Sequence, residues 1–209
     1  MTIIATSLPA IIAAVSDIIN QNADEVAKLD QAIGDGDHVI NLQRGLKALS
    51  DQSTELAQCD WSTAFQKMGM TLMTTMGGAS GSLFGTLFLA LSKAIPKDTE
   101  LTMPLFADAF SQAVVAVKKR GKADIGEKTM LDVLIPVADS MQQSAAKSTA
   151  LSDVINNLQQ AAITGVESTR EMLATKGRAS FLGERSRGHI DAGAKTSQLM
   201  ICTISELIA

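Results

Sequence analysis

MGMTLMTTMGGASGSLFGTLFLALS, the stretch from Met68 to Ser92, carries no charged side chain and is long enough to cross a bilayer. Its middle segment, Gly77-Gly-Ala-Ser-Gly81, breaks the run, and its threonines and serines are poor groups to face lipid. Its apolar residues recur at intervals of three and four, as on the buried face of a helix. The stretch therefore predicts two buried helices that meet at a glycine turn, and not a membrane span.

The same apolar spacing continues along nearly the whole chain, whereas the alternation typical of strands is not sustained anywhere. No repeat or linker divides the 209 residues, so we expect one all-α domain. Proline and glycine positions set the expected helix ends. The expected helices cover Leu8–Gln31, His38–Ser50, Trp61–Met76, Ser80–Ala94, Thr102–Arg120, Glu127–Ala146 with a kink at Pro136, Leu151–Thr175 and Ala194–Ile208.

The composition excludes several classes of protein. An apolar content of 46% is enough for a large core, while a net charge of −4 and only 3% aromatic residues exclude a nucleic-acid partner. Cys59 and Cys202 match no zinc or redox spacing and are expected to be core residues of a cytoplasmic protein. The first lysine is Lys28, so we expect no signal peptide and a mature chain that begins at or near Met1.

Three aspartates occupy the short segment Asp30-Gln-Ala-Ile-Gly-Asp35-Gly-Asp37. Mutual repulsion makes such a cluster costly unless a cation neutralises it. Carboxylates are hard ligands and no cysteine is nearby, which favours Mg²⁺, Ca²⁺ or Mn²⁺ over zinc. The alternative is a plain turn between helices, in which Asp37 caps the next helix and the other two acids are solvated. The spacing alone leaves both interpretations open.

Two other glycine-bearing junctions gather polar residues. Gly77–Ser82 leads into a helix, whose free N–H groups suit a phosphate, although close packing of two helices explains the glycines equally well. The long segment Lys176–Gly193 holds three arginines. Of these we expect Arg178 to bind phosphate, and Arg185 and Arg187 to belong to a solvated surface.

His38 directly follows the acidic segment. Its imidazole is compatible with a catalytic base, a hydrogen-bond donor to phosphate or a structural group. The three neighbouring acids favour a hydrogen-bond donor to phosphate over a nucleophile that becomes phosphorylated. Asn41 lies one turn further along the same helix face. His189 has no comparable neighbourhood, so we expect it to be structural.

Together these segments resemble the L subunit of dihydroxyacetone kinase, the nucleotide-binding component of that enzyme. The resemblance covers most of the chain in the family's order, and the combination of motifs is specific. The matching stretches are Leu29–His38, Gly77–Gly81 with Leu83–Thr86, Arg120–Ala123 with Lys128–Met130, and Gly177–Ser180 with Leu182–Ser186 through to Asp191.

The resemblance implies an antiparallel eight-helix barrel that holds ADP and two Mg²⁺ ions in a cup at one end. It implies that Asp30, Asp35 and Asp37 coordinate the metal pair, which bridges the nucleotide phosphates, and that His38 and Arg178 contribute to catalysis. Ala79 and Ser80 would hold phosphate, whereas Gly121 and Met130 would border the adenine and ribose. The implied nucleotide-binding residues are His38, Val39, Ile40, Asn41, Gly78, Ala79, Ser80, Gly121, Met130, Arg178, Asp191, Ala192 and Gly193.

Four positions depart from the family pattern. Val39, Ser82, Ile125 and Ala192 stand where the family usually has Gly, Pro, Pro and Pro. We expect Val39 to add bulk beside the nucleotide and Ala192 to loosen the segment that closes over it. These changes bear on affinity and substrate choice more than on the existence of the site.

The resemblance also implies partners. In the family the L subunit works with a separate K subunit that binds the ketose covalently through a histidine, and phosphate reaches the bound ADP from a phosphotransferase-system protein. A lone L-type chain suggests this version, acting on dihydroxyacetone or a close ketose. The alternatives are a nucleotide-sensing regulatory module without turnover, the L subunit of an ATP-dependent ketose kinase, or a structural bundle without a ligand. The oligomeric state, a homodimer included, stays open.

Overall fold

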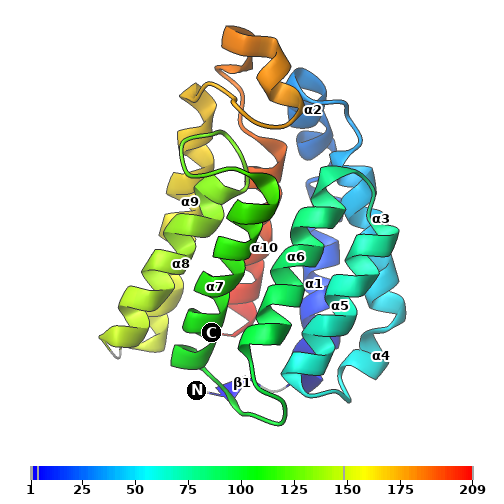
Figure 1. Cartoon of the computed structure of the whole chain (residues 1–209), viewed down its shortest axis with the longest axis vertical. Helices are drawn as coiled ribbons and strands as arrows, with labels where there is room; N and C mark the ends of the chain where they lie inside the picture. Colours follow the sequence, from blue (N-terminus) through cyan, green and yellow to red (C-terminus); the bar gives the residue numbers. More distant parts are fainter. Residues whose placement is uncertain (1, 4, 148, 209) are drawn as a thin grey trace.

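The computed structural model describes residues 2–3, 5–147 and 149–208, and most of them are helical (Figure 1). Met1, the expected start of the mature chain, lies outside the described residues. The α-helices are α1 (Leu8–Gln21), α2 (Ala23–Ile33), α3 (His38–Asp51), α4 (Ser53–Leu56), α5 (Trp61–Thr75), α6 (Gly78–Ala94), α7 (Met103–Gly121), α8 (Leu131–Ala146), α9 (Leu151–Ser168) and α10 (Ala192–Leu207). Short 3₁₀ segments are η1 (Ala5–Ser7), η2 (Thr169–Glu171) and η3 (Arg178–Ser186), and β1 (Thr2–Ile3) pairs antiparallel with β2 (Leu101–Thr102).

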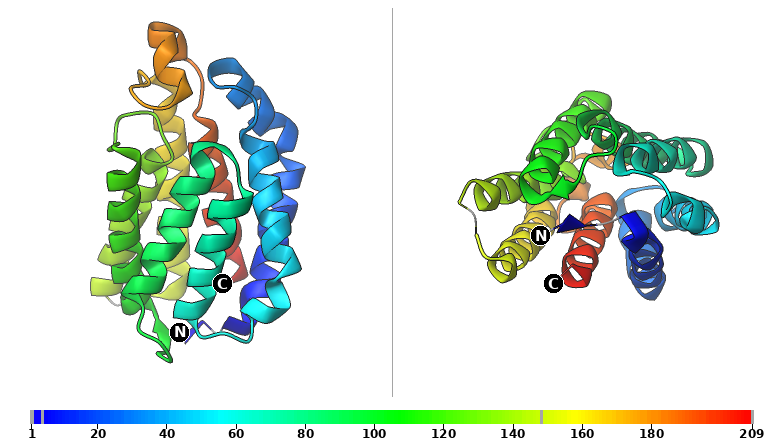
Figure 2. Two further views of the ribbon diagram at one scale, coloured as in Figure 1. Left: turned by 45° about the vertical axis from the view of Figure 1, so that its right-hand side comes forward. Right: turned by 90° about the horizontal axis from the view of Figure 1, so that it is seen from below.

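The long helices form a closed ring. Each packs on the next in the order α1, α3, α5, α6, α7, α8, α9 and α10, and α10 packs back on α1. Neighbours along this ring run in opposite directions, and the view from below in Figure 2 shows them arranged around a common centre. With α2 extending α1, the prediction of an all-α, antiparallel barrel of eight helical rods is confirmed.

Apolar faces and small residues hold the ring together. In α1, for example, Leu8, Ile12, Val15 and Ile19 recur at helical spacing and are buried. Gly69 and Gly85 let α5 and α6 approach closely, since a Cβ on Gly69 would be 3.0 Å from the Gly85 carbonyl oxygen. The two helices expected within Met68–Ser92 therefore pack tightly as a pair. Among the described helices, none is long and apolar enough to span a membrane.

Two of the expected helix boundaries at the N-terminal half are wrong. The expected helix Leu8–Gln31 is divided at Asn22, whose backbone leaves helical geometry with ψ 11°. Its side-chain amide donates to the carbonyl of Ile18 at 2.8 Å, and such local bonds compete with the helix ladder. Helix α6 begins at Gly78 and not at Ser80, because Gly77 takes the extended conformation of a cap. The short helix α4 had no sequence prediction.

Three boundaries in the C-terminal half also differ from expectation. Helix α8 begins at Leu131 and not at Glu127, since Gly126 and Lys128 both have positive φ, at 86° and 61°. Helix α9 ends at Ser168, where the chain tightens into η2, seven residues before the expected Thr175. Helix α10 begins at Ala192 instead of Ala194 because Asp191 caps it. The expected core cysteines, Cys59 and Cys202, are half-buried against the core.

All the segments that the sequence marks as functional lie at one end of the ring. The loop after α2, the turn before α6, the loop between α7 and α8, and the η3 segment gather at the top of Figure 1. Both chain ends lie at the opposite end. The ring therefore brings together residues that are far apart in sequence.

Replacing Gly165 by alanine should destabilise the ring. A Cβ there would be 2.4 Å from the Asp132 carbonyl oxygen of α8, which has lost its usual helical donor because Pro136 has no N–H. We expect a loss of about 1–3 kcal/mol in the free energy of unfolding, measured by urea denaturation. An unobstructed Gly→Ala change in a helix would instead stabilise the protein by about 1 kcal/mol. A variant that is more stable than the wild type would therefore contradict the close contact between Gly165 and α8. The exposed neighbour Thr164→Ala is the control.

Candidate functional site

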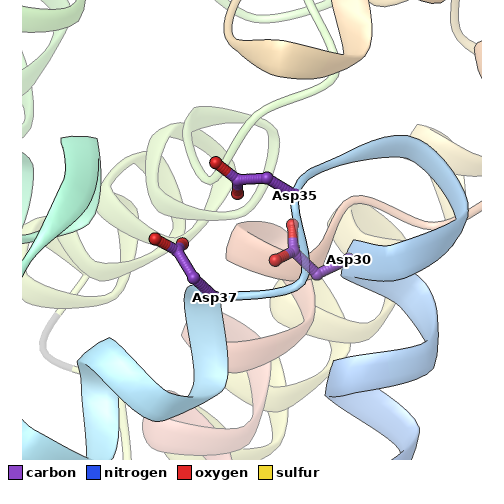
Figure 3. Close-up of side chains that lie close together, drawn as sticks. All are labelled: Asp30, Asp35 and Asp37. Atoms are coloured by element: carbon purple, nitrogen blue, oxygen red, sulfur yellow. The ribbon is translucent and has the colours of Figure 1, made fainter.

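The three aspartates of the acidic segment form one cluster. Ligand oxygens of Asp30, Asp35 and Asp37 all lie within 4.8 Å of one another. Figure 3 shows the three carboxylates projecting into a shared space between the end of α2 and the start of α3. Asp30 is half-buried, whereas Asp35 and Asp37 are exposed. This donor set, oxygen only and partly open, fits a hard divalent cation that keeps room for water or phosphate.

The glycines of the loop make this convergence possible. A Cβ on Gly34 would be 2.1 Å from Oδ1 of Asp30, so no other residue fits without moving that carboxylate. Gly36 has φ 78°, in the left-handed region. The backbone N–H of His38 then donates to Oδ2 of Asp30 at 3.1 Å. The loop therefore folds the start of α3 back onto the last turn of α2.

The competing interpretation of a plain turn is wrong on one point, the cap by Asp37. Asp37 occupies the N-cap position, but its backbone is helical and its side chain accepts no capping hydrogen bond. Its carboxylate instead lies with those of Asp30 and Asp35. The side chain that would stabilise a plain turn is thus part of the acidic cluster.

Arg178 reaches this cluster from the distant η3 segment. Its Nη2 lies 2.9 Å from Oδ2 of Asp35, although the arginine side chain is 73% exposed. Arg187 pairs with Glu184 at 2.8 Å on the surface, as expected for a solvated arginine. The structure therefore separates Arg178 from Arg187 in the way the sequence predicted.

The glycine turn before α6 lies against α3. A Cβ on Gly77 would be 2.6 Å from the side-chain oxygen of Asn41, and Gly78 has φ 68°. At the same time Gly78, Ala79 and Ser80 form the first turn of α6, where backbone N–H groups have no helical acceptor. The structure confirms that the glycines allow close packing. The packing also brings the N-terminus of α6 near the acidic cluster, since an added Cβ on Gly78 would be 3.9 Å from Oδ1 of Asp37, and phosphate binding at this turn stays a prediction.

His38 connects three elements of the site. It is 8% exposed, with Nδ1 3.0 Å from Oγ of Ser80 in α6 and Nε2 3.0 Å from Oγ1 of Thr196 in α10. Burial lowers the pKa of His38, although Asp30 and Asp37 oppose this, so the imidazole is neutral.

The bonds around Thr196 assign the tautomer of His38. The hydroxyl of Thr196 donates to the carbonyl of Gly193 at 3.1 Å, so its oxygen accepts from Nε2–H. Nδ1 of the neutral ring then accepts from the hydroxyl of Ser80. Both ring nitrogens are occupied, and a direct contact with phosphate would have to displace a hydroxyl. The role of His38 as a hydrogen-bond donor to phosphate, or as a base, stays a prediction.

The start of α10 forms the other side of the site. Asp191 caps this helix by accepting from the Ala194 N–H at 2.8 Å. Burial, reinforced by the negative charges of Asp132 and Asp30, raises the pKa of Asp191 to about 6. An added Cβ on Gly193 would be 3.7 Å from Cβ of Met130, so the expected residues Met130 and Asp191–Gly193 do lie together.

Sequence reasoning missed Thr196 and two buried charged residues, Lys128 in the loop that follows α7 and Asp132 in the first turn of α8. The Asp132 carboxylate accepts from the N–H groups of Gly126 at 2.5 Å and Thr129 at 2.7 Å. The Lys128 ammonium donates to the carbonyls of Thr169, Arg170 and His189. Burial raises the pKa of Asp132 and lowers that of Lys128. The only sequence signal was the stretch Lys128–Met130, which carries the resemblance but says nothing about burial.

Residues 32–206 match the DAK2 domain. The chain belongs to the DAK2 domain family. It is 41% identical, over 87% of its length and 86% of the relative's, to the ADP-binding subunit of PEP-dependent dihydroxyacetone kinase 1 from Listeria innocua. It is 37% identical to the corresponding subunit from Escherichia coli, over 88% of each chain. A PTS-dependent subunit from Lactococcus lactis is 38% identical over 91% of each chain. The resemblance stated from the motifs is confirmed.

A solved structure shares the fold. The dihydroxyacetone kinase from C. freundii, in complex with AMP-PNP and Mg²⁺, superposes with a TM-score of 0.75 at 21% identity. The match covers 99% of this chain and 35% of that one. The DAK2 fold of this chain therefore corresponds to about a third of the longer kinase.

The four departures from the DAK2 pattern have separate structural outcomes. The side chain of Val39 is 5% exposed and packs in the main core. The core therefore accommodates the extra side-chain volume that the sequence placed beside a nucleotide. Ser82 accepts from Nε of Arg120 at 2.6 Å and so joins α6 to the end of α7. Ile125 is exposed, and Ala192 is buried as the first residue of α10.

The remaining expected residues lie near the same end of the ring. Ile40, in the first turn of α3, is 56% exposed and offers an apolar surface. Gly121 ends α7, where an added Cβ would lie 3.4 Å from a methyl group of Leu83. These positions fit an apolar ligand surface beside the acidic cluster, and their contact with a nucleotide stays a prediction.

Asp191 should make the free energy of unfolding of the nucleotide-free protein depend on pH. Because the folded chain holds the Asp191 proton more tightly than the unfolded chain, this group favours folding at low pH, and that contribution is lost as the pH rises from about 4 to about 6. Asp191→Asn keeps a capping oxygen but cannot ionise. We expect the variant to gain up to about 2 kcal/mol over the wild type between these pH values, by urea unfolding in EDTA. Parallel curves for the two proteins would contradict the raised pKa.

Proposed function

We propose that this chain is the ADP-binding subunit of a cytoplasmic, phosphotransferase-system-dependent dihydroxyacetone kinase. It holds ADP with two Mg²⁺ ions and passes phosphate from a phosphotransferase-system donor, through the bound nucleotide, to dihydroxyacetone or a close ketose on a separate K subunit. The observation that carries this proposal is the cluster of three carboxylates within 4.8 Å, which lies between a helix N-terminus and Arg178. The names of the bacterial relatives supply the substrate and the donor class.

In this proposal Asp30, Asp35 and Asp37 hold the metal ions. Bound Mg²⁺ would neutralise the phosphate oxygens and lower the cost of the charge that develops during transfer. The neutralisation has to be shared with the protein, because three carboxylates and a diphosphate carry more negative charge than two divalent ions offset. Arg178 supplies a further positive charge, and it already pairs with Asp35 at 2.9 Å.

The first turn of α6 would receive the phosphate groups. Its backbone N–H groups at Gly78, Ala79 and Ser80 present positive partial charge, and this turn contains no acidic side chain. His38 fixes the orientation of the Ser80 hydroxyl, since the ring nitrogen Nδ1 accepts a hydrogen bond from it. Ser80 then keeps its oxygen in a constant position while backbone groups bind the anion.

The nucleoside would lie between the remaining positions. Met130 and Gly193 are close enough to form one wall, with Asp191 and Ala192 at the start of α10. Val39, Ile40 and Asn41 belong to the first turn of α3, and Gly121 ends α7 at the same end of the ring. Apolar walls with a few fixed polar groups are typical of nucleoside pockets.

Asp30→Asn should remove nucleotide and metal together. The purified protein is denatured, released nucleotide is quantified by chromatography, and magnesium is measured on the same sample. We expect near one ADP per chain in the wild type, at least about tenfold less in Asp30→Asn, and no ketose phosphorylation with the K subunit and its donor. Asp98→Asn, an exposed carboxylate in the loop before β2, is the matched control. Full activity of Asp30→Asn would exclude the metal assignment, and ADP binding without any ketose phosphorylation in the wild type would indicate a regulatory module.

Chelation should destabilise the wild-type protein through the same site. A ligand that binds only the folded chain raises its stability, so removing Mg²⁺ and ADP is expected to lower the Tm by several degrees, or about 2 kcal/mol. Differential scanning fluorimetry with and without EDTA measures the shift. Asp30→Asn serves as the comparison, because its melting curve should not respond to EDTA. An equal response in both proteins would place the metal effect elsewhere.

A further inference from the structure

The chain contains one lysine that is 1% exposed, Lys128, in the loop between α7 and α8. None of the ion pairs among the described residues includes it. Its ammonium instead donates to three backbone carbonyls, those of Thr169, Arg170 and His189. An ammonium has three donors, and burial is tolerable only when they are all used. The position is also constrained in its backbone, since Lys128 has φ 61° without being glycine.

The three carbonyls lie on either side of the segment that carries Arg178. We define residues 176–188 as the arm, which is coloured orange at the top of Figure 1. Thr169 and Arg170 belong to η2, shortly before the arm, and His189 directly follows it. The Gly188 N–H also donates to the Arg170 carbonyl at 2.8 Å. One ammonium thus joins the chain that enters the arm to the chain that leaves it.

The residue before Lys128 binds the base of the arm as well. The Glu127 carboxylate accepts from the Thr175 hydroxyl at 2.9 Å and lies 3.4 Å from the Lys176 ammonium. It also accepts from the Asp124 N–H at 2.7 Å, which ties it to its own loop. Two consecutive residues of the loop between α7 and α8 therefore hold the base of the arm.

Beyond this base the arm is held by a small apolar cluster and a few polar contacts. Ser186 is fully buried and its hydroxyl accepts from the Ala174 N–H at 3.0 Å, while Arg187 donates to the Glu171 carbonyl. Ala179 and the half-buried Leu182 pack on Ile33 at the end of α2 in a cluster separate from the main core. Phe181 is 86% exposed, and Gly177, Gly183 and Gly188 have positive φ, which costs little in glycine. The polar contacts of Ser186 and Arg187 reach residues 171–174, just before the arm, so the arm depends on this base for its position.

The same contacts extend to the start of α10. Thr169 is fully buried, and its hydroxyl accepts from the Asp191 N–H at 3.1 Å while its carbonyl accepts from Lys128. Asp191 then caps α10 and precedes Gly193, which lies beside Met130. Lys128 is therefore linked to the arm through His189, which directly follows it, and to the α10 cap through Thr169, which binds Asp191.

We propose that Lys128 is a positioning residue that fixes the arm and the α10 cap relative to each other, so that Arg178 and Asp191–Gly193 close on the same nucleotide. This inference rests on the proposed function, because it concerns the same site. Among the described residues the hydrogen-bond partners of the Lys128 ammonium are the backbone carbonyls of Thr169, Arg170 and His189, so its proposed effect on the nucleotide acts through these segments. A residue with a merely structural role would change global stability, whereas Lys128 should change the position of the arm in a protein that stays folded.

Limited trypsin digestion of the nucleotide-free protein tests the anchoring directly. Trypsin can cleave within the arm after four residues, and Lys128→Met leaves all four unchanged: Lys176, Arg178, Arg185 and Arg187. We expect cleavage at these sites to be about tenfold faster in Lys128→Met than in the wild type, with an unchanged rate at Arg44 on α3. Lys67→Met, which removes a lysine paired with Glu55 at the other end of the ring, is the matched control and should digest like the wild type. Unchanged cleavage of the arm in folded Lys128→Met would overturn the proposal.

Titration calorimetry of the nucleotide-free proteins with ADP and Mg²⁺ tests the consequence for the site. We expect Lys128→Met to bind ADP about tenfold more weakly than the wild type, while Lys67→Met binds normally. Equal ADP affinity in Lys128→Met and in the wild type overturns this inference and leaves the proposed function intact. A wild-type protein that binds no ADP overturns the proposed function instead.

If Lys128→Met does not fold, a second variant tests the proposal. Glu127→Ala removes contacts to Thr175 and Lys176 at the surface, so the protein should stay folded. Because it loosens only one side of the base, we expect cleavage in the arm to be about threefold faster than in the wild type. Wild-type digestion of Glu127→Ala would count against an arm held by this loop.

Discussion

Closure of the helix ring is the constraint on which the rest of this structure depends. Each long helix carries an apolar face, and a row of helices would leave the faces at its two ends in water. The packing of α10 on α1 removes those ends, so aliphatic side chains fill the interior. Groups that need water or a ligand are thereby moved to the loops. At one end those loops carry the acidic cluster, the glycine turn and the arm.

The polar groups at this end are stabilised by mutual contacts and not by exposure alone. His38, Lys128 and Asp132 are all buried and hydrogen-bonded. The partners of His38 and Lys128 come from distant segments, whereas those of Asp132 lie in the loop directly before it. Among the described side chains, no buried nitrogen or oxygen lacks a partner. Fully partnered networks of this kind fix the positions of the residues that they join. The geometry of the site therefore depends on the buried polar residues His38, Lys128 and Asp132 as well as on the aspartate cluster.

The differences between predicted and observed helices have local causes. Helical spacing of apolar residues continues through Asn22, but the Asn22 side chain bonds to the carbonyl of Ile18 and interrupts the helix. Spacing also continues through Glu127 and Lys128, where the buried ammonium finds its acceptors only if the backbone adopts a positive φ. In both places a specific polar contact outweighs a periodicity that reports only which face is buried.

By itself, the sequence determined the all-α class, the pairing of two helices at the glycine turn, and the grouping of three aspartates in one short loop, whose role as metal ligands stays a prediction. These features depend on contacts between residues close in sequence, as with Asp30, Asp35 and Asp37, so spacing and local chemistry suffice to predict them. Family motifs supplied Arg178 and Asp191. Only the tertiary structure decided the neutral, bridging state of His38 and the anchoring role of Lys128. Their partners, Thr196 and His189, are far away in the chain, and only the closed ring brings them within hydrogen-bonding distance.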